Sequence, residues 1–259
     1  LHHCSEIVQV SNSYNYRGIL WIRKSVGIFG AYCFSMSMEH EELVKCSKCG
    51  HEDGFVIWQS LNATLNPEAK ADMMESCLFE HKCPKCGHVD SYTYDLLYHD
   101  MESMLMIQLC ETEERVADYI AMFDDLSKKT DDLIKMDDDY TLRLVNSRNN
   151  LREKVYIFDQ GLDDRIIELM KLFIRFDISQ ENPEHEVDEI FLEIRDDVPT
   201  RFAICLTDGQ WGSVPFNQEV YDRIKEEMID PEDNGKRDYI VNMQWAGECI
   251  HNMAEKLNE

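Results

Sequence analysis

The stretch that decides the fold is Lys45-Cys46-Ser47-Lys48-Cys49-Gly50-His51, which returns as Lys82-Cys83-Pro84-Lys85-Cys86-Gly87-His88. In each copy two residues separate two cysteines, so that one tight turn can direct both sulfurs at a single ion. The glycines Gly50 and Gly87 can adopt positive φ, which lets the chain curl around a metal with its N–H groups near the sulfurs. The repeat therefore predicts a tetrahedral site with four ligands, namely Cys46, Cys49, Cys83 and Cys86.

Zinc is the expected metal because of its availability, and iron in a rubredoxin-like centre is the alternative. Four sulfur ligands do not by themselves distinguish tetrahedral zinc from tetrahedral iron. A redox dithiol would require the motif between a strand and a helix, whereas the residues after each copy, 55–58 and 91–94, have the composition of strands. His51 and His88 are interpreted as polar neighbours, since four cysteines already close the coordination shell.

The charge of the chain argues against nucleic acid and membrane surfaces as partners. The 259 residues carry a net charge of −25 and are 44% hydrophobic, enough for a real core. Such negative charge repels phosphate backbones and anionic lipids. Between Met38 and Cys110 there are five basic residues, and four of them flank the cysteines, where they compensate the charge of a zinc tetrathiolate. We therefore expect a protein partner and regard a nucleic-acid-binding ribbon as disfavoured.

The remaining six cysteines have no paired spacing, which is typical of free thiols in the reducing cytoplasm. Residues 1–37 carry a net charge of +2, against −27 for residues 38–259. We expect residues 1–37 to be a non-native or disordered leader, read from a misplaced start. A secretory signal is the alternative, but its apolar run, Val26 to Phe34, is short and lacks a clean cleavage site. No stretch of the sequence reaches the ~18 apolar residues of a membrane span.

Hydrophobic periodicity predicts an α+β protein. Residues 38–176 are expected to form a zinc ribbon with a β-hairpin extension (Tyr92–Tyr98 and Met104–Cys110, turning at 99–102), a helix from Thr112, and an antiparallel helical hairpin. A short helix should begin at Asn66-Pro67. The first helix of the hairpin should carry Leu144, Leu151, Val155 and Phe158 and end at Gly161.

The acidic stretch 177–189 contains Pro183 but no lysine or arginine, and it is expected to be a linker. Residues 190–259 should then form a C-terminal α+β portion. Its expected strands are 190–194, 202–207, 211–216 and 239–243. A helix over 217–228 and a closing helix to Leu257 complete the prediction.

Tyr98, His99 and Asp100 form the only compact set of acid/base-capable side chains near the ribbon. Nucleotide-binding, hydrolase and zinc-protease motifs are absent from the sequence. A His-Asp pair at a hairpin turn more often serves the turn than catalysis. The expected function is a cytosolic zinc-binding interaction module, and the alternative is an enzyme, such as a hydrolase, with a site at these three residues.

The two knuckles resemble those of the CpXC domain family, whose name describes two C-P-x-C motifs. The resemblance extends from about residue 41 to about residue 175 and includes Trp58-Gln59-Ser60-Leu61-Asn62, Leu97-Tyr98-His99-Asp100 and Arg143-Leu144-Val145-Asn146-Ser147-Arg148. Cys83-Pro84-Lys85-Cys86 fits the motif, whereas Ser47 replaces the proline of the first copy. The resemblance implies a fold similar to zinc β-ribbons with a bound metal, and it specifies no substrate.

Overall fold

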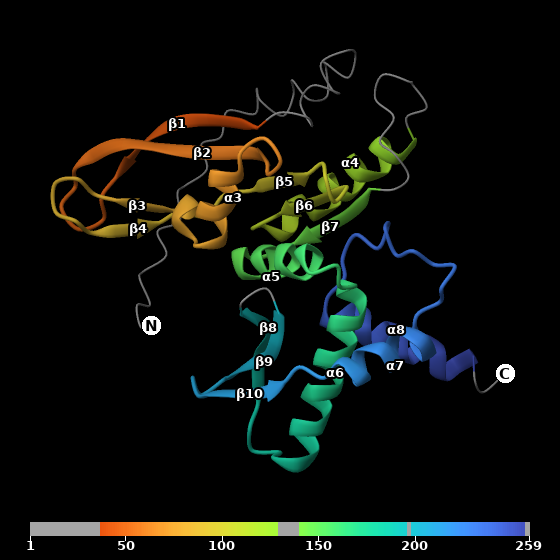
Figure 1. The fold of residues 1–259 in the computed structure, drawn as a ribbon. Coiled ribbons are helices and arrows are strands. Elements are labelled where there is room, and N and C mark those ends of the chain that lie inside the picture. Colours follow the sequence, from red (N-terminus) through yellow and green to blue (C-terminus); the bar gives the residue numbers. More distant parts are fainter. Residues whose placement is uncertain (1–36, 129–139, 196–197, 257–259) are drawn as a thin grey trace. The chain divides into compact units, whose positions relative to one another are not determined.

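The computed structural model describes residues 37–128, 140–195 and 198–256 (Figure 1). The chain divides into two compact units, one ending at Arg148 and one beginning at Asn149. The predicted leader lies outside the described residues except for its last member, Ser37. The Ser37 hydroxyl accepts a hydrogen bond from the Asn62 N–H at 2.8 Å and donates to the Asn66 side chain at 2.6 Å. Ser37 is therefore attached to the first unit.

A five-stranded mixed sheet in the order β1-β2-β5-β6-β7 forms the body of the first unit. β1 with β2 and β5 with β6 are antiparallel pairs, whereas β2 with β5 and β6 with β7 are parallel. The predicted β5–β6 hairpin is confirmed, but its turn follows Asp100, so His99 and Asp100 belong to the strand. The strands are β1 (Met38–Lys45), β2 (Glu52–Asn62), β5 (Leu96–Asp100), β6 (Leu105–Leu109) and β7 (Thr141–Val145).

A smaller two-stranded sheet carries the second knuckle. It consists of β3 (Glu80–Lys82) and β4 (Val89–Ser91), and it follows α3 (Pro67–Met74) and a single 3₁₀ turn, Cys77–Phe79. The helix α3 begins at Pro67 as predicted, although the Asn66 side chain accepts from Ser37 rather than capping the helix. Beyond Ser91 the predicted strand is absent from the described residues. Instead the Tyr92 and Tyr94 rings pack at 5.0 Å from Phe55 and Phe79, respectively.

Leu144 is a correction to the sequence prediction. It was expected on a helix together with Leu151, but it lies in β7, where residues 142–145 are all buried beside β6. A short apolar run is compatible with the hydrophobic periodicity of a helix and with that of a strand. The run becomes a strand because it pairs with β6. The predicted helix from Thr112 is found as a 3₁₀ turn, Glu113–Arg115, followed by α4 (Val116–Lys128).

In the second unit, α5 (Arg148–Asp159) and α6 (Asp164–Glu181) follow each other across Gly161, which has φ +65° as predicted. Figure 1 shows the two helices crossing steeply, in contrast to the predicted antiparallel hairpin. The reason is that the apolar face of α6, including Ile166 and Leu169, packs into the core of the second sheet.

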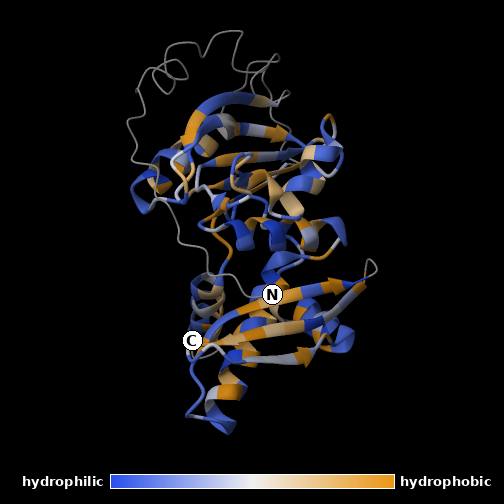
Figure 2. Ribbon diagram, turned by 90° about the vertical axis from the view of Figure 1, so that its left-hand side faces the viewer, coloured by the Kyte–Doolittle hydropathy of each residue, from blue (hydrophilic) through white to orange (hydrophobic). Residues whose placement is uncertain are grey.

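That sheet has the antiparallel order β10-β9-β8, and hydrophobic residues recur along its strands (Figure 2). Its strands are β8 (Val187–Arg195), β9 (Val198–Leu206) and β10 (Trp211–Pro215), and α7 (Gln218–Met228) and α8 (Met243–Lys256) follow. Phe202 and Ile204 of β9 meet Tyr221 and Ile224 of α7 in one core. Three of the four predicted strands and both predicted helices are therefore confirmed.

Two further predictions for this unit are wrong. The stretch 177–189, expected to be a linker, is helical up to Glu181 and extended from Val187, because Ile178 and Val187 join the core. The strand expected at 239–243 does not form. Val241 is buried there, and the Asn242 side chain accepts from the Trp245 N–H at the start of α8.

Candidate metal centre

The two cysteine motifs fold into the same turn twice. In each, the N–H of the first cysteine donates to the carbonyl of the histidine five residues later, at 2.9 Å in one copy and 2.8 Å in the other. The glycine N–H then donates back to the cysteine carbonyl at 2.9 Å in both copies. The two glycines have φ +69° and +70°, the left-handed conformation that other residues rarely adopt. The residues are Cys46, Gly50 and His51 in the first knuckle and Cys83, Gly87 and His88 in the second.

These turns bring the four cysteine sulfurs together, all within 4.8 Å of one another. The Cys46–Cys86 and Cys49–Cys83 sulfur pairs are 3.6 Å and 3.7 Å apart. Four sulfurs about 2.3 Å from a tetrahedral zinc ion lie roughly 3.8 Å apart, so the spacing fits such an ion. One pair is supplied between β1 and β2 and the other between β3 and β4. The donor set is therefore suited to a tetrahedral metal with thiolate ligands.

The sulfurs differ in how readily they lose a proton. Burial raises the pKa of the Cys46 thiol to about 12. Burial acts in the same direction on Cys83, but the backbone N–H groups of Cys86 and Lys85 point at its sulfur and outweigh burial, which leaves the pKa of Cys83 at about 7. Backbone donors of this kind stabilise a thiolate, the form that binds metal. Because like charges this close repel, ionisation of all four requires a cation between them.

Asp90 joins the two knuckles, and sequence reasoning missed it. Its buried carboxylate accepts from the hydroxyl of Ser47 and from the Ser47 N–H at 3.2 Å, and it lies 3.5 Å from His88 Nε2. Proline, which the family motif has in place of Ser47, could supply neither donor. The missing proline was the available signal, since the serine introduces two donors that need an acceptor.

The four lysines predicted to compensate the site, Lys45, Lys48, Lys82 and Lys85, are all exposed. His51 and His88 supply backbone carbonyls to their own knuckles, and neither is needed to complete a four-sulfur set. The geometry thus accounts for the repeated Gly-His ending as part of the turn.

Tyr98, His99 and Asp100 follow one another in β5, where the Tyr98 hydroxyl donates to the Asp100 carboxylate at 3.4 Å. They are 0%, 4% and 8% exposed. Because successive strand residues point to opposite faces, His99 lies on the other face from its two neighbours. His99 Nε2 is 3.0 Å from the Tyr140 hydroxyl, whereas the Asp100 carboxylate accepts from the N–H groups of the following turn.

Asp100 has the electrostatics of a turn residue. Burial opposes its ionisation, but hydrogen bonds from Ser103 and the charge of Lys70, 3.7 Å away, outweigh burial and lower its pKa. An ionised carboxylate that accepts from the turn N–H groups stabilises the β5–β6 connection. Of the predicted acid/base trio, Tyr98 and Asp100 are therefore in contact with each other, whereas His99 contacts Tyr140.

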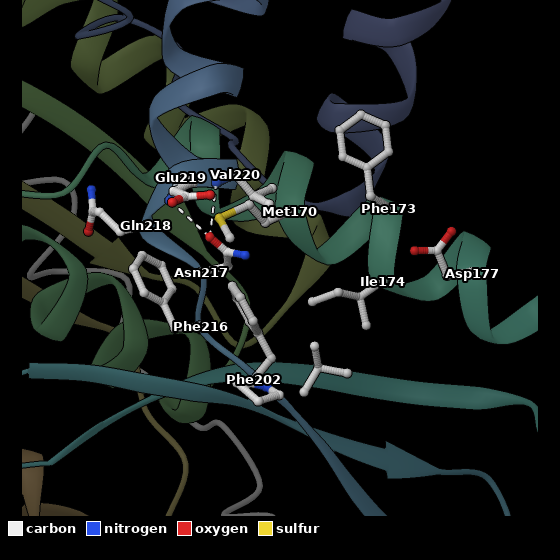
Figure 3. A pocket seen from close by; sticks show the side chains of 12 residues that line it. Met170, Phe173, Ile174, Asp177, Phe202, Phe216, Asn217, Gln218, Glu219 and Val220 are labelled. Atoms are coloured by element: carbon white, nitrogen blue, oxygen red, sulfur yellow. Dashed lines mark hydrogen bonds between the residues drawn. The ribbon is translucent and has the colours of Figure 1, made fainter.

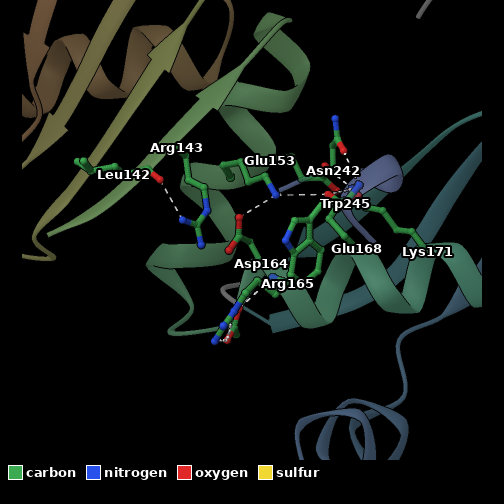
Figure 4. A network of polar contacts seen from close by, with 11 residues as sticks. Leu142, Arg143, Glu153, Asp164, Arg165, Glu168, Lys171, Asn242 and Trp245 are labelled. Atoms are coloured by element: carbon green, nitrogen blue, oxygen red, sulfur yellow. Dashed lines mark hydrogen bonds and ion pairs between the residues drawn. The ribbon is translucent and has the colours of Figure 1, made fainter. Parts of the chain in front are cut away.

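A second cluster that sequence reasoning missed is a set of buried charges in the second unit (Figure 4). Lys171 Nζ lies 2.6 Å from Glu153 and 3.1 Å from Glu168, and Lys154 Nζ lies 2.8 Å from Asp164. All five side chains are buried. Glu153 also accepts from the Leu192 N–H of β8 at 2.7 Å, so the cluster joins α5, α6 and β8.

The cluster shifts the pKa values of Glu153 and Lys171. Burial raises the pKa of Glu153, with Lys171 acting against it. Burial acts to lower the pKa of Lys171, but Glu153 and Glu168 outweigh burial and raise it. The signal in the sequence was the presence of charged residues on helix faces that are otherwise apolar, such as Glu168 and Lys171 beside Leu169.

Comparison with known proteins gives one family. The family model described as CpXC protein matches residues 44–171, a range that contains both knuckles, Asp90 and the whole buried charge cluster. Searches of curated proteins and of solved structures returned no match. Among the described residues, no helix has both the length and the apolar composition to cross a membrane. The chain carries the four-cysteine centre at the position of the matched domain, and its residues 44–171 belong to the CpXC family.

Proposed function

We propose that the protein is a cytosolic interaction module whose ribbon is held together by a structural Zn²⁺ at Cys46, Cys49, Cys83 and Cys86. The observation that carries this proposal is the convergence of four sulfurs in two matching turns. A catalytic zinc keeps one coordination position for water or substrate, whereas four thiolates occupy every position of a tetrahedral ion. The metal would therefore supply folding energy rather than chemistry.

Metal analysis of the purified full chain tests the centre. We expect one zinc per chain, lost in the Cys86→Ser variant and retained in Cys77→Ser, because Cys77 is an exposed thiol outside the cluster. Substitution with Co²⁺ should give the absorption of a tetrahedral tetrathiolate site. A reddish protein that contains iron would show that the centre is a rubredoxin-like iron site and not a zinc site. A protein that binds neither metal would overturn the proposal.

The interaction role is supported by charge and by the arrangement of the acid/base residues. The net charge of −25 favours a basic protein as the partner. A hydrolase acting through Tyr98, His99 and Asp100 receives no support, because His99 lies on the other face of β5 from the hydrogen-bonded Tyr98 and Asp100. A cytoplasmic location agrees with the eight cysteines of the described chain, none of which forms a disulfide.

Nucleic-acid binding is the competing role for a ribbon with exposed lysines. We expect oligonucleotides to bind no more tightly than ~10⁻⁴ M at physiological salt, since few phosphate contacts are available to release counterions. Fluorescence anisotropy across a salt series measures this affinity. A micromolar, salt-dependent affinity that is lost in the double variant Lys48→Glu with Lys85→Glu would show instead that the ribbon binds nucleic acid.

A further inference from the structure

A groove of about 700 Å³ lies within the second unit, between α6, the end of β10 and the start of α7 (Figure 3). We call it the α6–β10 groove. Met170 and Ile174 of α6 face Phe202 of β9, Val214 of β10 and Phe216 across it. Its volume is in the range of ligand-binding clefts, which are mostly apolar with a few polar groups at the edge.

Several apolar side chains of this groove are not fully buried by the fold. Ile174, Val214 and Phe216 are only partly buried, although they pack against the core. On α6, Phe173 is 36% exposed and Phe176, one residue before a groove residue, is 59% exposed. Apolar surface that continues beyond a hollow is typical of a binding face for another molecule.

The charged residues that line the groove are both acidic. Asp177 and Glu219 lie on opposite sides of the apolar side chains (Figure 3), and no lysine or arginine is among the lining residues. The N-terminus of α7 is not available to an anion, because the Asn217 side chain already accepts from the Glu219 and Val220 N–H groups. The groove is therefore electrostatically complementary to a cation.

The shape favours an extended segment over a compact molecule. β10 is an outer strand of its sheet in the described chain, and Gly212 precedes Val214 on the same face. A Cβ atom at Gly212 would meet nothing within 4 Å, so the open surface continues along the strand. A second copy of this chain is a poor occupant, because it would bring another net charge of −25 to an acidic groove.

We propose that the α6–β10 groove binds a peptide segment of a partner protein in which large apolar residues adjoin lysine or arginine. The apolar side chains fill the hollow beside Met170 and Ile174, and the cationic groups lie at Asp177 and Glu219. This inference rests on the proposed function, for which it names the binding surface and the chemistry of the partner.

Three capped peptides of equal length test the groove on the zinc-loaded full chain. The first contains phenylalanine, leucine and lysine; the second has glutamate in place of lysine; the third has serine in place of the apolar residues. The NMR signal of the Met170 methyl group, identified with Met170→Leu, reports on the groove. We expect only the first peptide to shift this signal and to bind in isothermal titration.

Charge reversal provides the matched comparison. The double substitution Asp177→Lys with Glu219→Lys should lower the affinity of the protein for the first peptide by about tenfold, which corresponds to about 1.4 kcal/mol of binding free energy. The control pair Glu181→Lys with Glu226→Lys changes the net charge equally on the same helices, outside the groove, and should have little effect. The proposal is overturned if no peptide binds, if all three bind alike, or if the two charge-reversal pairs weaken binding equally.

The outcomes also separate this inference from the proposed function. Binding of the first peptide with no change at Met170 would reject the groove and leave a basic partner at another surface. A protein without metal would reject the zinc centre whatever the peptides do. Equally tight binding of a small lipophilic amine, such as dodecylamine, would overturn the assignment to a peptide.

Discussion

The ribbon around the two knuckles and the core of the second unit are stabilised by different interactions. The smaller ribbon sheet has two strands of three residues each, and its main long-range contacts are four converging sulfurs and a few aromatic rings. The second unit instead surrounds a continuous core of buried aliphatic and aromatic side chains contributed by six elements. A ribbon this small cannot bury enough apolar surface to fold by itself. Ligands should therefore control the stability of the first region, and packing that of the second.

Removal of the metal is expected to have the largest effect and to separate the two regions. Structural zinc contributes apparent free energies of about 10–16 kcal/mol in small zinc domains. A chelator, or the Cys46→Ser substitution, should therefore expose the amides of β3 and β4 while α6 and β9 remain protected. Hydrogen exchange measured by mass spectrometry on the full chain gives both readings. If both units lost amide protection equally, or if neither lost any, the metal would not distinguish the stability of the two regions.

The buried charges are the feature of the second unit that departs from pure apolar packing. Replacement of Lys171 by methionine leaves Glu153 buried without its partner at 2.6 Å, and such a change typically costs about 3–5 kcal/mol. The exposed Lys225→Met change serves as the control and should be nearly neutral. Urea-dependent hydrogen exchange of β8 peptides measures the difference.

A second variant tests why Lys171→Met is expected to lose stability. In Glu153→Gln with Lys171→Met the charge is removed, while the amide oxygen can still accept from the Leu192 N–H. We expect most of the lost stability to return. If the double variant were as unstable as Lys171→Met alone, the cost would come from packing rather than from an uncompensated charge.

Within the ribbon, the contact between Ser47 and Asp90 should have a smaller effect. Ser47→Ala removes one donor from a buried carboxylate, which costs about 1–3 kcal/mol. Ser47→Pro removes the N–H as well, so it should destabilise the ribbon further, although proline is the residue of the family motif. Chelator midpoints of the two variants provide the comparison. Stabilisation by proline would show that the Asp90 contact is dispensable.

The smallest expected effect concerns Glu111, whose Oε1 is buried without a hydrogen-bond partner. Burial, with Asp95 adding to it and Arg148 opposing it, raises the pKa of Glu111 to about 7. Between about pH 4.5 and 7 the folded state therefore binds more protons than the unfolded chain, and stability falls as pH rises.

Glu111→Gln should accordingly raise the melting temperature at pH 8 by a few degrees and leave it nearly unchanged at pH 4. The exposed Glu114→Gln change is the control. Calorimetric scans across this pH range measure the effect. A stabilisation that is equal at both pH values would show that ionisation of Glu111 is not its cause.

Local chemistry explains what could be predicted from the sequence. Each knuckle brings two cysteines and a glycine into one turn, so the motif alone predicts the geometry, and the repeat predicts that the two turns meet. The start of α3 at Pro67 and the left-handed Gly161 were likewise local features. In all of these, residues close in sequence determine the backbone.

The remaining features depended on partners far away in the chain. Leu144 is in a strand because β6 lies beside it, and Asp90 accepts from a serine 43 residues earlier. Residues 177–181 stay helical because apolar side chains of α6 reach a core formed with later strands. The buried charges of Glu153 and Lys171 become favourable only when two helices and β8 bring opposite signs together. The sequence by itself determined the four-cysteine cluster and the α+β class. Tertiary contacts decided which ambiguous segments became strand or helix and which polar groups could be buried, because burial of a polar group is stable only when a distant partner satisfies it.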